Sequence, residues 1–214
     1  MLWGGGTMVW KLLFGSACCY LYGSIPFAYL FTRWFSGKNL IEYGSGNAGV
    51  ANAFRAGGLR AGYLTVVAEL SKALLPVLIS GYYSNRSLTL TLAWVFCSLL
   101  GTIYPVFFRF RGGRGRTVAG WATLFLSPLV AVAIGILWLT VSFLFKKPHL
   151  SFLIATFAYP FISLLISMKW PFFFFGLGVS ALFLISSSKS KNEFERYRVF
   201  ERLEEWNWGK GRNA

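Results

Sequence analysis

Long apolar runs, each close to the length that a helix needs to cross a lipid bilayer, dominate this chain. A membrane-spanning helix requires about 20 mostly apolar residues. The runs lie near 8–31, 61–83, 88–105, 118–145, 150–168 and 170–187. Of the 214 residues, 56% are hydrophobic and only 13% are charged, and the mean hydropathy is +0.56. We therefore predict an all-α fold, a polytopic integral membrane helical bundle.

The fourth run decides the number of spans, because Ser127 and Pro128 interrupt it. If 118–145 makes two crossings, the chain has about seven spans. Most of the Lys and Arg residues then lie on one side, in 32–60, 106–117, 146–149 and the C-terminal tail. The positive-inside rule makes that side cytoplasmic and leaves the N-terminus outside. A segment as short as 118–127 cannot cross alone, so we expect it to be a half-span.

The chain divides into one transmembrane domain, 1–187, and an amphiphilic, mixed-charge cytoplasmic tail, 188–214. All seven acidic residues are glutamates, which leaves few carboxylates for a metal cage. Cys18, Cys19 and Cys97 lie in apolar runs without the paired spacing of a metal site. We expect no metal, no cofactor and no nucleic-acid partner, and the sequence leaves the oligomeric state open.

Two short polar segments combine glycine with arginine or asparagine beside the apolar runs. They are 44–49 (GSGNAG) and 109–116 (RFRGGRGR). Glycine lets several backbone N–H groups turn toward one anion, and arginine presents a planar charged fork that matches phosphate oxygens. Either segment alone is equally consistent with an ordinary loop that follows the positive-inside rule. Together they favour phosphate chemistry at a membrane face, next to lipid.

Two ionisable residues lie inside the second run. Glu69 and Lys72 are three residues apart, so on a helix they share a face and can pair. Ionisable groups within a span are costly and face protein or water. We favour a structural ion pair over a functional one.

Several ordered motifs between Gly23 and Pro128 resemble one known family, the bacterial acyl-phosphate:glycerol-3-phosphate acyltransferases of the PlsY type. The matching segments are 23–27 (GSIPF), 44–52 (GSGNAGVAN) with Arg55 and Gly57, 101–107 (GTIYPVF), 111–115 (RGGRG) and 127–128 (SP). The family is a seven-span membrane bundle with a cytoplasmic catalytic face, in agreement with the charge distribution above.

The resemblance implies transfer of a fatty acyl group from acyl phosphate to the 1-hydroxyl of glycerol 3-phosphate, which forms lysophosphatidic acid and phosphate in phospholipid biosynthesis. The expected partners are these two substrates and membrane lipids, and the expected location is the bacterial inner membrane. The family's first loop supplies an essential serine and arginine, here Ser45 and Arg55. Its second glycine loop resembles a glycerol-phosphate site, here Gly112, Gly113, Arg114 and Gly115.

Elementary chemistry agrees with these assignments. Acyl phosphate is already activated, so the enzyme must mainly hold two anions together and stabilise the oxyanion. Ser45 has no histidine or aspartate nearby in sequence to activate it, which favours hydrogen bonding over nucleophilic attack. The expected catalytic residues are Ser45, Asn47, Asn52 and Arg55, and we favour hydrogen bonding to phosphate or oxyanion for Ser45, Asn47 and Asn52. The expected phosphate-binding residues are Gly46, Gly49, Arg111, Gly112, Gly113, Arg114 and Gly115.

The chain also departs from the family pattern. The differing positions are Ala51 for threonine, Glu69 for aspartate, Thr102 for histidine, Arg114 for lysine and Val118 for threonine. The family's C-terminal His-Arg-Glu-Asn cluster is not recognisable in 191–196. Two other hypotheses therefore stay open. In the first, the chain is a non-catalytic paralogue that either binds anionic lipid precursors or partners the true acyltransferase. In the second, it is a transporter of a phosphorylated solute.

Overall fold

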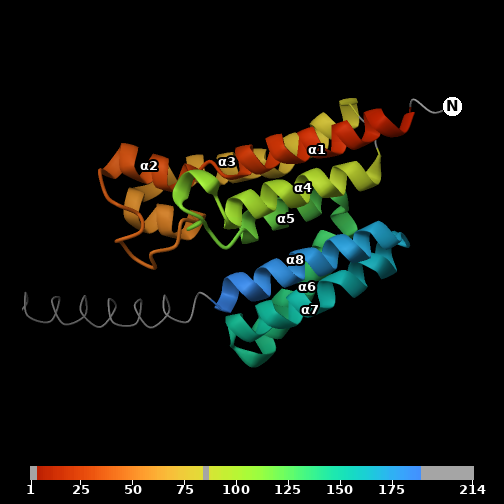
Figure 1. Cartoon of the computed structure of the whole chain (residues 1–214). Coiled ribbons are helices and arrows are strands. Elements are labelled where there is room, and N and C mark those ends of the chain that lie inside the picture. Colours follow the sequence, from red (N-terminus) through yellow and green to blue (C-terminus); the bar gives the residue numbers. More distant parts are fainter. Residues whose placement is uncertain (1–3, 84–86, 189–214) are drawn as a thin grey trace, which may run out of the picture.

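The structure, a computed structural model, describes residues 4–83 and 87–188, and its regular elements there are all helical (Figure 1). They are α1 (Gly4–Gly23), α2 (Phe27–Ser36), α3 (Val50–Tyr83), α4 (Leu88–Ile103), the 3-10 turn η1 (Val106–Phe108), α5 (Arg116–Leu126), α6 (Pro128–Phe145), α7 (Pro148–Ser167) and α8 (Trp170–Ser188). The predicted all-α class is confirmed.

The first apolar run forms two helices where the sequence predicted one span over 8–31. The chain leaves α1 after Gly23 and enters α2 only after Pro26, which has no backbone N–H to continue a helix. α2 packs against α3 and ends at Gly37, whose φ of +68° is left-handed. This break turns the chain at one end of the bundle.

α3 begins earlier than the predicted span over 61–83. It starts at Val50 and bends at Gly58, where φ is +77° and ψ is −172°. Glycine tolerates this conformation because it has no Cβ. The bend separates a short helical segment, which carries Asn52 and Arg55, from the long apolar helix below it.

The run over 118–145 divides at Ser127, as the proline predicted, into α5 and α6. The 11 residues of α5 rise about 16 Å, well short of the roughly 30 Å hydrocarbon core. Among the described residues, five helical stretches are long and apolar enough to cross a membrane. The total of seven spans therefore stays a prediction, with α5 as its half-span.

Close packing of α1 on α4 fixes the end of the bundle where the chain turns. A Cβ on Gly23 would collide with the carbonyl oxygen of Ser98, and one on Gly101 with that of Tyr20. Small residues let membrane helices approach closely in this way. The α1–α2 turn is thereby held beside the last turn of α4.

Both glycine segments lie at one end of the bundle, and α8 returns the chain to that same end, while α1 starts at the opposite one (Figure 1). The predicted tail over 188–214 lies, beyond Ser188, outside the described residues, as does the segment over 191–196.

Candidate functional site

The first glycine segment is folded around one buried side chain, that of Asn52. Its Nδ2 donates to the carbonyl oxygens of Leu40 (2.9 Å) and Tyr43 (3.0 Å), and its Oδ1 accepts from the N–H of Ser45 (3.2 Å). Gly44, at φ +60°, lies so close that a Cβ would collide with Oδ1 of Asn52. Asn52 therefore shapes the loop from inside, with its polar atoms bonded to loop backbone.

The rest of the segment leaves polar groups within reach of solvent. Ser45, Gly46 and Asn47 are only half-buried, and Gly46 turns the chain at φ +68°. The carbonyl oxygen of Gly49 accepts from the N–H of Ala53 (3.0 Å) and so begins α3. Arg55 is exposed one turn further on.

The second glycine segment contains an unusual backbone turn. Arg109 and Phe110 have φ values of +51° and +57°, a left-handed conformation that is costly for residues with a Cβ. The N–H of Phe110 donates to the carbonyl oxygen of Pro105 (2.9 Å) and closes the turn. The chain then runs back over α4, where a Cβ on Gly112 would collide with the carbonyl oxygen of Thr102.

Positive charge gathers where this segment enters α5. Gly115, at φ +69°, precedes Arg116, the first residue of α5, whose unpaired N–H groups favour anions. Desolvation and then the neighbouring charge of Arg114 lower the pKa of Arg116 to about 10, so its guanidinium stays positive at neutral pH. That guanidinium lies 3.7 Å from the ring centroid of Phe152. Two arginines that are neighbours in the segment favour an anion beside them.

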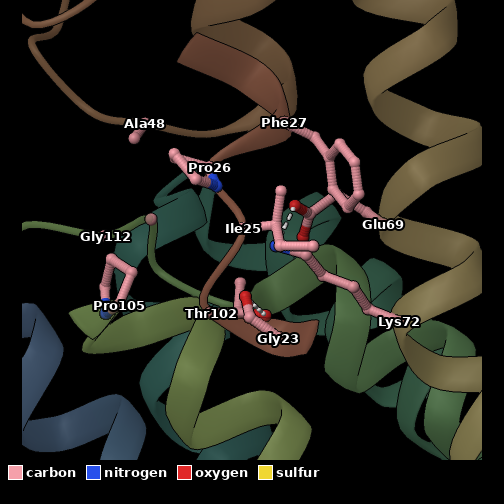
Figure 2. Close-up of a pocket in the computed structure, with 11 residues that line it drawn as sticks. Gly23, Ile25, Pro26, Phe27, Ala48, Glu69, Lys72, Thr102, Pro105 and Gly112 are labelled. Atoms are coloured by element: carbon pink, nitrogen blue, oxygen red, sulfur yellow. Dashed lines mark hydrogen bonds and ion pairs between the residues drawn. The ribbon is translucent and has the colours of Figure 1, made fainter. Parts of the chain in front are cut away.

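The two segments, far apart in sequence, meet. Gly113 lies so near Ala48 that a Cβ would be 2.6 Å from the Ala48 carbonyl oxygen, and its own N–H donates to Thr102 (3.2 Å). Beneath this junction is a pocket (Figure 2). Its walls are formed by Gly23, Ile25, Pro26, Phe27, Ala48, Glu69, Lys72, Thr102, Pro105, Gly112 and Gly113. The pocket therefore draws on the α1–α2 turn, α3, the end of α4 and both glycine segments.

Glu69 and Lys72 supply the charged side chains of this pocket. The predicted ion pair is confirmed, with Lys72 Nζ 3.2 Å from Glu69 Oε1. The two residues are 5% and 2% exposed. Both side chains extend from α3 toward the space beside Ile25 (Figure 2). The sequence favoured a structural pair, and its position on the pocket wall was not foreseen.

Of the residues predicted from the sequence, Gly112 and Gly113 line the pocket. The others lie around it, in the two segments or one turn into α3, and are not among the lining residues; they are Ser45, Gly46, Asn47, Gly49, Asn52, Arg55, Arg111, Arg114 and Gly115. Sequence reasoning missed Ala48 as a lining residue. It also missed the wall contributed by the 23–27 motif, which was noted only as a family feature.

The fold and the site together define a class: a polytopic helical membrane protein in which two glycine-rich loops, the second of them rich in arginine, meet over a pocket at one end of the bundle. A family model described as glycerol-3-phosphate acyltransferase matches residues 13–197. The chain belongs to this glycerol-3-phosphate acyltransferase family.

Individual relatives agree. A glycerol-3-phosphate acyltransferase of Syntrophomonas wolfei subsp. wolfei is 34% identical over 164 residues, which cover 77% of this chain and 83% of the relative. Two crystal structures of PlsY (YgiH), an integral membrane glycerol 3-phosphate acyltransferase, are similar in fold. The glycerol 3-phosphate form has a TM-score of 0.73 at 26% identity, and the lysophosphatidic acid form 0.70 at 27%. Each match covers 87% of this chain and 93% of the other.

Proposed function

We propose that this protein transfers a fatty acyl group from an acyl phosphate to the 1-hydroxyl of glycerol 3-phosphate, forming lysophosphatidic acid and releasing phosphate. The observation that carries the proposal is the contact of Gly113 with Ala48, which joins both glycine segments over one pocket. Relatives named glycerol-3-phosphate acyltransferase, and PlsY structures with glycerol 3-phosphate and lysophosphatidic acid, support the acceptor and the product.

The arginines suit the electrostatic demand of this reaction. Two anionic substrates must be held side by side, and negative charge develops on the acyl oxygen as the hydroxyl oxygen attacks the acyl carbon. The bond from that carbon to the phosphate oxygen then breaks, and phosphate leaves with the electron pair. Arg55, Arg111 and Arg114, with the N–H groups of Gly112 and Gly115, would hold the phosphates. The N–H of Gly113 is already bonded to the Thr102 carbonyl oxygen, so Gly113 contributes close backbone packing.

In the first segment the roles divide by burial. Ser45, Gly46, Asn47 and Gly49 are half-buried, and we assign Ser45 and Asn47 to hydrogen bonds with a substrate phosphate or the developing oxyanion. Asn52 is 1% exposed and bonded to the backbone. It acts as a positioning residue, in place of the hydrogen bond to phosphate or oxyanion expected from the sequence.

The membrane location follows from the same arrangement. The fold is that of a multi-pass membrane protein, and the relatives named above are bacterial. We place the chain in the bacterial inner membrane with both glycine segments and the C-terminal tail in the cytoplasm. The concentration of Lys and Arg on that side supports this orientation.

Acyl transfer by the purified protein in lipid cubic phase tests the proposal. Palmitoyl phosphate and glycerol 3-phosphate are supplied, and both inorganic phosphate and lysophosphatidic acid are measured. We expect the two products in equal amounts, only when both substrates are present, and their loss in Arg114→Ala. Palmitoyl-coenzyme A serves as the control donor and should give no product.

A negative result would favour the non-catalytic hypothesis, for which the sequence offers one specific observation: the tail contains no histidine. Binding of glycerol 3-phosphate without product, measured by calorimetry, would support a paralogue that binds lipid precursors.

A further inference from the structure

The ion pair on the pocket wall joins no two parts of the fold. Glu69 and Lys72 both belong to α3, at i and i+3, so their contact ties one turn of a helix to itself. Burying two charges costs free energy that their mutual attraction only partly offsets. A pair that neither links helices nor faces water gives little stability in return. Its position on the pocket wall offers a different reason for its presence.

The pair is also held firmly in place. Ser98 of α4 donates to the carbonyl oxygen of Lys72 (2.8 Å), which fixes that turn of α3 against α4. The Lys72 ammonium lies 5.3 Å from the ring centroid of Phe27, the first residue of α2, which also lines the pocket. The Glu69 carboxylate is therefore presented at a defined place beside the α1–α2 turn.

Chemistry limits what such a carboxylate can bind. A phosphate group is repelled by a carboxylate, whereas a hydroxyl donates a hydrogen bond to it. Among the residues that line this pocket, all of them described, Glu69 is the sole carboxylate and there is no histidine. A proton acceptor within reach of the attacking hydroxyl accelerates acyl transfer to an alcohol.

We propose that Glu69 is the proton acceptor for the attacking hydroxyl, and that Lys72 is the positioning residue that holds its carboxylate. This inference rests on the proposed function. As the 1-hydroxyl oxygen of glycerol 3-phosphate forms its bond to the acyl carbon, the hydroxyl proton passes to Glu69. The bond from that carbon to the phosphate oxygen breaks, and the departing phosphate takes the electron pair and then the proton, which restores the carboxylate.

The test replaces the carboxylate without changing its shape. In Glu69→Gln we expect kcat to fall by about 10²- to 10⁴-fold, the range for loss of a general base, with little change in the KM for glycerol 3-phosphate. Glu69→Asp keeps a carboxylate and should retain more activity than the glutamine variant. Glu42→Gln, an exposed glutamate outside the pocket, is the matched control and should keep wild-type kcat.

A second variant separates catalysis from folding. Glu69→Gln leaves the Lys72 charge buried and unpaired, whereas Glu69→Gln with Lys72→Met removes both charges. Recovery of thermal stability in the double variant without recovery of kcat supports the proposal. Near wild-type kcat in either variant would overturn it and leave a substrate phosphate as the proton acceptor. A wild-type protein that makes no lysophosphatidic acid would instead overturn the proposed function, and this inference with it.

Discussion

Gly113 of the second glycine segment lies directly against the carbonyl oxygen of Ala48 in the first, and a Cβ at Gly113 would stand 2.6 Å from that oxygen. A side chain there must push the two segments apart. Backbone atoms on both sides leave little freedom to yield.

Gly113→Ala should therefore separate the segments while the membrane helices stay folded. We expect kcat/KM for glycerol 3-phosphate to fall by up to about 10²-fold, as small misplacements of binding groups do, with a nearly unchanged unfolding temperature. Gly120→Ala in α5, where a Cβ meets nothing within 4 Å, is the matched control. Equal activity of the two variants would contradict a shared site at this contact.

Asn52→Ala removes the side-chain amide around which the first segment is folded. Three hydrogen bonds to Leu40, Tyr43 and Ser45 are lost, of which the one to Leu40 is buried, and a buried backbone group left unpaired costs about 1–3 kcal/mol. We expect faster proteolysis within 40–49 and a raised KM for glycerol 3-phosphate. Asn52→Asp keeps an acceptor for the N–H of Ser45 but loses both donated bonds. Its KM for glycerol 3-phosphate should lie between those of the wild type and the alanine variant. A wild-type KM in the alanine variant would argue against a positioning role.

Arg114→Lys tests whether charge alone is enough in the second segment. Lysine keeps the positive charge but lacks the planar fork that binds two phosphate oxygens together. We expect the lysine variant to retain measurable turnover and Arg114→Ala to lose about 10²-fold or more, as when one preorganised donor is removed. Calorimetric binding of glycerol 3-phosphate and the kinetics of acyl transfer together measure this difference. If alanine and lysine variants bind glycerol 3-phosphate equally well, the charge of Arg114 plays no part in binding.

Gly101→Ala tests the packing that holds the α1–α2 turn beside α4. The new Cβ would collide with the carbonyl oxygen of Tyr20, a backbone atom that moves only with α1. We expect a lower unfolding temperature in detergent, because overpacking of a close contact costs about 1–3 kcal/mol. Gly135→Ala in α6, where a Cβ meets nothing within 4 Å, should leave the unfolding temperature unchanged or slightly higher.

The sequence alone was sufficient for features that depend on local chemistry. Apolar runs of bilayer length predicted the helical membrane class, and Pro128 predicted the division between α5 and α6. Glycine and arginine in two short segments pointed to phosphate binding, because backbone freedom and charge are properties of the residues themselves. The Glu69–Lys72 pair followed from helical spacing.

Only the tertiary structure decided how these parts combine. The contact of Gly113 with Ala48, the inward turn of Asn52 and the place of Glu69 on the pocket wall all depend on how α1, α3 and α4 pack, which no local pattern encodes. The sequence treated Asn52 as a ligand contact because its amide suits a phosphate equally well. Which groups an amide meets is fixed by the neighbours that folding brings to it, and here they are the backbone atoms of its own loop.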